Sequence, residues 1–209
     1  MGSTFFGPIK ITCFAHASVL LSFNELNFYI DPFVVSKGSP LADAIFLTHE
    51  HFDHMVVPKS ILKSNTKIIS RGGKIPSMEI NVGDRIKVFG IEVWAVDAYN
   101  VDKPFHPKGF GCGFIFTFPT PQKSTRIYVA GDTDLIEEMK NYLADVAILP
   151  IGGTYTMNAE QAAKAASIIK PKLAIPYHYN YLSETKADPK EFEKTVKFFS
   201  KDIDVKILL

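Results

Sequence analysis

Three histidines and an aspartate within six residues are the feature of this sequence that most restricts its fold and chemistry. They are His49, His51, Asp53 and His54, and they follow the apolar run from Ile45 to Thr48. If that run is a strand, its extended continuation turns alternate side chains to one side, so His49 and His51 face one point. As the chain then turns toward a helix, Asp53 and His54 face a second point nearby. The spacing therefore predicts two neighbouring cations.

The competing interpretation is that these histidines are buried and held only by ordinary hydrogen bonds. Each buried imidazole needs a polar partner, and three clustered at the end of an apolar strand need several at once. A metal site meets that need with fewer additional groups, so we favour it.

Length and composition indicate one globular domain, which we expect to span residues 1–209, with 46% hydrophobic and 22% charged residues. The 23 basic and 22 acidic residues nearly cancel, which argues against a nucleic-acid partner and favours a small-molecule substrate. Ile11 to Phe23 is too short to span a bilayer, and residues 1–8 lack the pattern of a secretory signal. We therefore expect a cytoplasmic protein, and a homo-oligomer is compatible with the sequence. Cys13 and Cys112 lack metal or redox spacing and are expected to be small buried apolar residues.

The first two thirds of the chain are expected to be mainly β-structure. Strands are predicted at residues 9–14, 18–23, 26–30, 44–47, 67–70, 85–89, 91–98, 114–118 and 126–130, with a helix-like stretch at 56–63. After Asp132 helices and strands alternate. Asn158 is expected to cap a helix over 159–170, and Asp188 is expected to cap a second helix. Strands are predicted before, between and after these helices, at residues 146–149, 173–175 and 205–208. This pattern predicts an α/β protein with two stacked sheets and helices outside.

The run from His49 to His54 resembles the His-X-His-X-Asp-His signature of the metallo-β-lactamase superfamily. Residues 29–33 resemble its early strand ending in Asp31, and residues 130–133 its later Gly-Asp-Thr element. More narrowly, residues 14–18, 149–157 and 175–180 are similar to the UlaG-like branch, which includes L-ascorbate-6-phosphate lactonase. The resemblance implies a four-layer αββα sandwich of two mixed β-sheets flanked by helices, with the site at one edge of the sheets.

The resemblance also implies a set of metal ligands. His49 and His51 would bind the first metal, while Asp53, His54 and His178 would bind the second, with Asp132 bridging. In much of the superfamily the third imidazole of the first metal follows a strand in the middle of the chain, where this sequence has Tyr99-Asn100. His106 is the only histidine between His54 and His178, so it is assigned to that role by elimination; the alternative is an ordinary surface histidine.

Five further residues are expected around the ligands, each with a plainer alternative. Asp31 orients a ligating imidazole, or is a turn residue before Pro32. His16 contacts substrate, or forms a hydrogen bond in the core. The loop containing Thr154 receives an anionic substrate group, or is a plain connection from strand to helix. Tyr177 and Asn180 shape the pocket, or simply pack.

Imidazole and carboxylate ligands without thiolate suit zinc, and also manganese or iron. We expect two divalent ions, zinc first, that activate water for hydrolysis of a small ester-like substrate such as a lactone. The branch resemblance implies that this substrate carries an anionic group. Asp53 and Asp132 are the expected catalytic carboxylates.

Three other functions remain as alternatives. The first is a phosphodiesterase acting on a small cyclic or lipid phosphodiester, or less readily a nuclease, with the same two metals. A di-iron redox enzyme is disfavoured because such relatives place a glutamate where His51 stands, and Glu50 is one position out of phase. A non-catalytic zinc module is disfavoured because structural zinc sites are closed four-ligand cages.

Overall fold

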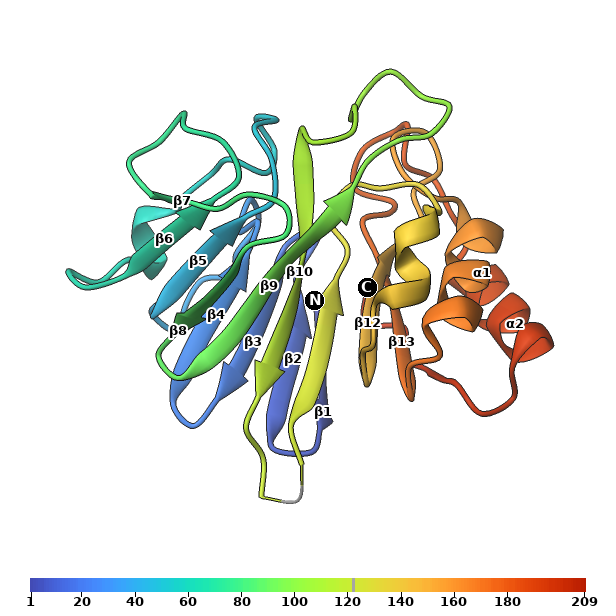
Figure 1. Ribbon diagram of the computed structural model, residues 1–209, viewed down its shortest axis with the longest axis horizontal. Coiled ribbons are helices and arrows are strands. Elements are labelled where there is room, and N and C mark those ends of the chain that lie inside the picture. The colour runs from blue at the N-terminus through green and yellow to red at the C-terminus, as the bar shows by residue number, and fades with distance from the viewer. Residues whose placement is uncertain (122) are drawn as a thin grey trace.

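Two seven-stranded β-sheets packed face to face form the body of the protein in the computed structural model, which describes residues 1–121 and 123–209 (Figure 1). The first sheet consists, in spatial order, of β1 (Gly2–Phe6), β2 (Ile9–Cys13), β3 (Val19–Phe23), β4 (Leu26–Ile30), β5 (Ala44–Leu47), β6 (Lys67–Ser70) and β7 (Met78–Glu79). The second consists of β14 (Asp204–Val205), β13 (Leu173–Tyr177), β12 (Val146–Pro150), β11 (Thr125–Val129), β10 (Gly111–Phe118), β9 (Ile91–Ala98) and β8 (Arg85–Val88).

Three layers of buried side chains hold the sheets and their covers together. The largest lies between the sheets and is rich in phenylalanine, with Phe46 packed edge-to-face against Phe114 and Phe116 at centroid distances of 5.3 and 5.0 Å. Helices α1 (Ala159–Ile169) and α2 (Pro189–Phe199) and the 3-10 helix η2 (Glu137–Asn141) cover the outer face of the second sheet. Figure 1 shows α1 and α2 beyond β12 and β13.

The outer face of the first sheet has a thinner cover. It is formed by the 3-10 helix η1 (Lys59–Ile61) and by loop residues such as Val35, Met55 and Val57. The four-layer αββα arrangement is confirmed, although this layer is mostly loop. The helix-like stretch expected at 56–63 is only these three residues, because Pro58 lies extended at φ −66° and ψ 127° and disfavours helix in the residue before it.

The other helix boundaries follow their caps. Asn158 accepts from the backbone N–H of Gln161, and the Gln161 side chain accepts from the N–H of Asn158, so α1 begins with a complete capping box. Asp188 caps α2 with Pro189 in its first turn.

Four strands differ most from the sequence expectation. β1 and β7 were not expected; β1 pairs antiparallel with β2 from Gly2 opposite Cys13, and β7 pairs parallel with β6. β10 begins three residues earlier than expected. Gly113 permits this, because a Cβ at that position would lie only 2.7 Å from the carbonyl oxygen of Ala130. The last strand covers only Asp204–Val205 rather than residues 205–208. Beyond it the chain leaves the second sheet, and the backbone of Leu208 lies against Gly2.

In the described part of the chain, no helix is both long enough and apolar enough to cross a membrane.

Candidate metal centre

Strand direction explains why residues far apart in the sequence meet at one edge of the sandwich. In the first sheet, β2 and β4 are both antiparallel to β3, and β5 is parallel to β4. In the second, β9 and β11 are both antiparallel to β10, and β12 and β13 are parallel to β11. The predicted site residues follow the ends of strands that share a direction within each sheet: His16 after β2, Asp31 after β4, His49, His51, Asp53 and His54 after β5, His106 after β9, Asp132 after β11 and His178 after β13.

The first cluster consists of His49, His51 and His106. Nδ1 of His51 lies 3.1 Å from Nε2 of His49 and 3.2 Å from Nε2 of His106. His49 and His106 are buried and His51 is half-buried. His106, assigned from the sequence by elimination, is therefore brought beside the two histidines of the signature.

The protonation of two of these rings is set by their outer neighbours. Thr48 donates its hydroxyl hydrogen to Asp31 at 2.6 Å, so its oxygen accepts from Nδ1 of His49 at 2.9 Å. The amide of Asn100 donates to a backbone carbonyl through Nδ2, so its Oδ1 accepts from Nδ1 of His106 at 2.9 Å. With Nδ1 protonated, the neutral rings of His49 and His106 both present an Nε2 lone pair to the centre of the cluster.

Three nitrogen atoms facing one another at this spacing match the donor set of a bound cation. Imidazole nitrogens about 2.0 to 2.1 Å from a tetrahedral zinc ion lie about 3.3 to 3.4 Å from one another. The distances of 3.1 and 3.2 Å between the cluster nitrogens are close to that value. Without a cation, the lone pairs of His49 and His106 would share at most one proton on His51, so the arrangement fits a metal better than a hydrogen-bond network.

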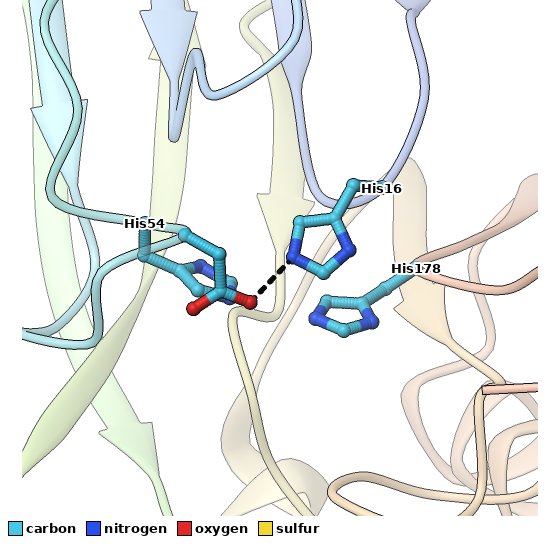
Figure 2. Close-up of side chains that lie close together, drawn as sticks. His16, His54 and His178 are labelled. Atoms are coloured by element: carbon cyan, nitrogen blue, oxygen red, sulfur yellow. Dashed lines mark hydrogen bonds and ion pairs between the residues drawn. The ribbon is translucent and has the colours of Figure 1, made fainter. Parts of the chain in front are cut away.

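The second cluster brings His54, His178 and Asp53 together with His16, each offering one atom within 4.8 Å of the others. Figure 2 shows the rings of His16, His54 and His178 turned toward one region, and its dashed line marks the contact of 2.7 Å between Nε2 of His16 and Oδ2 of Asp53. Nδ1 of His54 donates to Asp31 at 2.8 Å. Among the described residues, Nε2 of His54 and Nε2 of His178 have no hydrogen-bond partner although both are buried. Buried donors or acceptors left in this state are rare and indicate a missing ligand.

Asp132 lies between the two clusters and contacts both. Its Oδ1 is 3.2 Å from Nε2 of His178, and its Oδ2 is 3.6 Å from Nε2 of His54 and 3.5 Å from Nε2 of His106. A buried carboxylate in this position offers one oxygen to each side. It is geometrically able to bridge two ions.

The pKa of His54 shifts in the opposite direction from those of His16, His49, His51 and His106. Burial lowers the pKa of His49 well below its ordinary value, and it also lowers the pKa of His16, His51 and His106. Burial acts in the same sense on His54, but the carboxylates of Asp132 and Asp31 outweigh it and raise the pKa of His54 to about 9.

Both carboxylates of the centre are held ionised. Burial by itself would raise the pKa of Asp132, but His178 and His54 reverse that effect and hold it well below its ordinary range. The hydrogen bond from His16 does the same for the pKa of Asp53, with a smaller net lowering.

Backbone strain gathers at this edge of the sandwich. His16, Asp31 and His178 have φ values of 56°, 44° and 55°, in the left-handed region that residues with a Cβ seldom adopt. Such conformations persist where the surroundings impose them, and they cluster at functional sites. At His178 the backbone N–H also donates to the carbonyl oxygen of His16 at 3.1 Å, which ties the two segments together.

Comparison with known proteins identifies the family to which the chain belongs. The model of the β-lactamase superfamily domain matches residues 10–178, which include every residue of both clusters. The chain belongs to the metallo-β-lactamase superfamily.

Relatives within the superfamily show its general activity. The chain is 35% identical to a UPF0173 metal-dependent hydrolase of Methanoregula boonei, over 96% of this chain and 95% of the relative. It is 33% identical to the corresponding hydrolase of Archaeoglobus fulgidus, over 96% of both chains. The crystal structure of a metal-dependent hydrolase from Parabacteroides distasonis superimposes with a TM-score of 0.83 at 33% identity, covering 100% of this chain and 98% of that one. This superfamily member is a metal-dependent hydrolase.

Four of the remaining predicted residues of this superfamily member lie outside the two donor clusters. Asp31 accepts from His54 at 2.8 Å, which is the orienting contact expected of it. Tyr177 is buried between the sheets with its hydroxyl 3.4 Å from the Gly131 carbonyl oxygen. Asn180 exchanges two hydrogen bonds with the backbone of Ala187, and Thr154 donates to the carbonyl oxygen of Glu184 at 2.6 Å. These last three stabilise the core and loops, and none lines the cavity at the metal centre.

Sequence reasoning missed the residues that hold the outer nitrogens of the first cluster, Thr48 and Asn100. A signal for Asn100 was present, since Tyr99-Asn100 occupies the place where much of the superfamily has a histidine. In this fold Asn100 instead binds the backbone N–H and the Nδ1 of His106, at 3.0 and 2.9 Å.

Proposed function

We propose that this protein is a dinuclear metal hydrolase that cleaves small ester-like substrates, lactones included. The observation that carries the proposal is the pair of neighbouring donor clusters sharing Asp132. In the first cluster, Nδ1 of His51 lies 3.1 and 3.2 Å from the Nε2 atoms of His49 and His106. A structural zinc site would use one closed cage of four ligands, whereas these clusters offer donors for two ions.

The residues divide between the two ions. His49, His51 and His106 would hold the first, Asp53, His54 and His178 the second, and Asp132 would contact both. Nitrogen and oxygen donors without sulfur favour zinc, while manganese and ferrous iron prefer similar sets. When bound, the ions would supply Lewis acidity and lower the pKa of water toward neutrality.

The chain's own carboxylates would manage charge and protons. Asp53 is ionised near neutral pH, because its pKa is lowered by the hydrogen bond from His16, so a carboxylate oxygen is available to take a proton from the attacking water. Asp132 would contribute negative charge between the clusters. In the reaction, the water oxygen bonds to the acyl carbon, the ester C–O bond breaks, and the proton ends on the leaving alkoxide. A lactone would give one hydroxy acid.

The resemblance to the UlaG-like branch supports the choice of a lactone within the ester class. The segments that carry this resemblance are residues 14–18, 149–157 and 175–180, and they contain His16 and His178 of the second cluster. A phosphodiester is the competing substrate, because the same pair of ions serves displacement at phosphorus.

The test is an activity screen of lactones, esters, phosphomonoesters and phosphodiesters with the pure protein loaded separately with zinc, manganese and ferrous iron. We expect lactone or ester turnover, lost in His51→Ala and Asp132→Ala, while circular dichroism shows both variants folded. Asp202→Ala, which removes an exposed acid remote from the clusters, is the matched control and should retain activity. Cleavage of phosphodiesters without any ester turnover would refute the ester assignment, and full activity in both cluster variants would refute the site.

A further inference from the structure

The metal centre opens into a cavity of about 410 Å³ whose outer wall is apolar. Four loops each contribute one side chain to that wall. Phe52 comes from the loop after β5, Phe105 from the loop between β9 and β10, Tyr155 from the loop between β12 and α1, and Leu182 from the loop after β13. A cavity of this size fits a ligand of small-molecule dimensions.

Two of these four side chains are exposed to a degree that folding alone does not explain, while Tyr155 and Leu182 are half-buried. Phe52 is 76% exposed and Phe105 is 39% exposed. Phe105 and Tyr155 form an edge-to-face pair with ring centroids 4.8 Å apart, so two nearly perpendicular rings border the cavity. Clustered exposed aromatic groups beside polar donors are typical of a ligand site, because a bound apolar group removes them from water.

The charges around the cavity disfavour an anionic substrate group. Within residues 1–121 and 123–209, no lysine or arginine lines the cavity, and the acid beyond the metal clusters is the exposed Glu184. Lys103 and Lys108, which flank Phe105 and His106 in sequence, are paired with Asp134 and Glu138 instead.

Three backbone amides in the loop of residues 152–157 are already used within the protein. The backbone N–H of Gly153 donates to Met157, that of Thr154 donates to Gly152, and that of Met157 donates to Thr133. At the start of α1, the capping box uses the N–H groups of Asn158 and Gln161. Amides already bonded within the protein would have to break those bonds to bind an anion.

We propose that the substrate carries an uncharged apolar arm, aromatic or branched, that lies against Phe52, Phe105, Tyr155 and Leu182 while its ester group meets the metal clusters. The inference rests on the proposed hydrolase function and specifies its substrate class. An arm bearing a phosphate or carboxylate is rejected, since it would be desolvated against aromatic rings beside Glu184 without a cationic partner.

The test uses three aryl esters that differ only in the para substituent: hydrogen, carboxylate and trimethylammonium. With the metal-loaded wild type, we expect kcat/KM for the carboxylate ester to be roughly tenfold or more below that for the neutral ester. Phe105→Ala should lower kcat/KM for the neutral ester by a similar factor of about ten, mainly through KM. Phe198→Ala, which removes a phenylalanine 84% exposed on α2, is the matched control and should change neither value.

A charge variant at the cavity mouth gives a second measurement that leaves the apolar wall intact. Glu184→Lys alters an exposed side chain and should reduce the discrimination against the carboxylate ester. Equal turnover of the three esters, or a preference of the wild type for the carboxylate ester, would overturn the apolar arm and leave the hydrolase function standing.

Binding separates the inference from a failure of the hydrolase proposal. Saturation-transfer NMR with phenylacetamide, a neutral amide, should show binding to the wild type that weakens in Phe105→Ala and Phe52→Ala. Phenyl phosphate should bind to the wild type no better than to these two variants. If no ester is hydrolysed with any metal, this pattern would still support the apolar site. Phenylacetamide binding unchanged in both variants would overturn it.

Discussion

Nε2 of His16 lies 2.7 Å from Oδ2 of Asp53, although 37 residues separate them in the sequence. The pair is possible because β2 and β5 run in the same direction within one sheet, so the residues after them share an edge. Of the two interpretations that the sequence left for His16, the structure shows a buried hydrogen bond, with a carboxylate of the second cluster as its partner. This contact fixes the orientation of Asp53 toward His54 and His178.

Replacing His16 should therefore weaken metal binding at the second cluster. We expect His16→Ala to lower the affinity for the second ion by about 10- to 100-fold, the range for losing a group that orients a ligand, and His16→Gln to restore part of it through its amide N–H. Chelator competition with metal analysis measures the affinity. Unchanged affinity in His16→Ala would contradict the positioning role.

Asp31→Asn tests how the carboxylate behind His54 supports the centre. Asp31 accepts from the backbone N–H and hydroxyl of Thr48 and from Nδ1 of His54, at 2.8, 2.6 and 2.8 Å. An amide replaces one acceptor oxygen with a donor, so at least one of these groups loses its partner. We expect metal affinity to fall about 10- to 100-fold and unfolding free energy to fall by about 1 to 3 kcal/mol.

The matched control for Asp31→Asn is Asp43→Asn. Asp43 is also buried and accepts from the backbone of Asn27, but it lies at the other end of β5. It should lose stability in urea unfolding and keep its metal affinity. Equal loss of metal affinity in both variants would show that the effect is not specific to His54.

Metal uptake should release a proton from His54. In the metal-free protein its pKa is raised to about 9, so His54 is charged at neutral pH, while an ion requires the neutral ring. We expect His54 to contribute about one released proton per chain at pH 7.5, in addition to any proton released from metal-bound water, and the apparent affinity to increase as pH rises toward 9. Calorimetry in buffers of different ionisation enthalpy measures the release. Release that persists undiminished well above pH 9 would count against His54 as its source.

The same shift has a consequence for the stability of the metal-free protein. Because the folded-state pKa of His54 exceeds its ordinary value of 6.5, its proton stabilises the fold fully below pH 6.5, and that contribution is lost as pH rises through 9. The lowered pKa values of His49 and His106 act in the opposite sense and reduce stability as pH falls below 6.5.

Gly131→Ala should damage the centre through the backbone. Gly131 precedes Asp132 at φ +66°, and a Cβ there would lie 2.7 Å from the carbonyl oxygen of Cys112. We expect a loss of about 1 to 3 kcal/mol in urea unfolding, together with a fall in kcat, since relief of the clash displaces Asp132. Gly38→Ala is the control, because φ is +80° with open space around the added methyl. It should lose stability from strain alone and keep full activity.

The sequence by itself was sufficient for the local features of this protein. The period of two along an extended chain predicted that His49 and His51 face one point, and their nitrogens lie 3.1 Å apart. Asn158 and Asp188 marked the starts of α1 and α2, since capping depends on neighbours within one turn. The sheets and their helical cover followed from the same short-range patterns.

Only the tertiary structure decided which distant residues complete the site. His106, Asp132 and His178 follow strands of the second sheet and reach the signature after β5 of the first sheet because the two sheets pack face to face, and the partner of His16 depends on strand directions within the first sheet. Asn100 and the aromatic wall at Phe105 and Tyr155 had no periodic signal, because they lie in loops whose course is set by contacts with other segments. Spacing along a chain specifies neighbours within a few residues, while contacts across a sheet depend on which strands pair and in which direction.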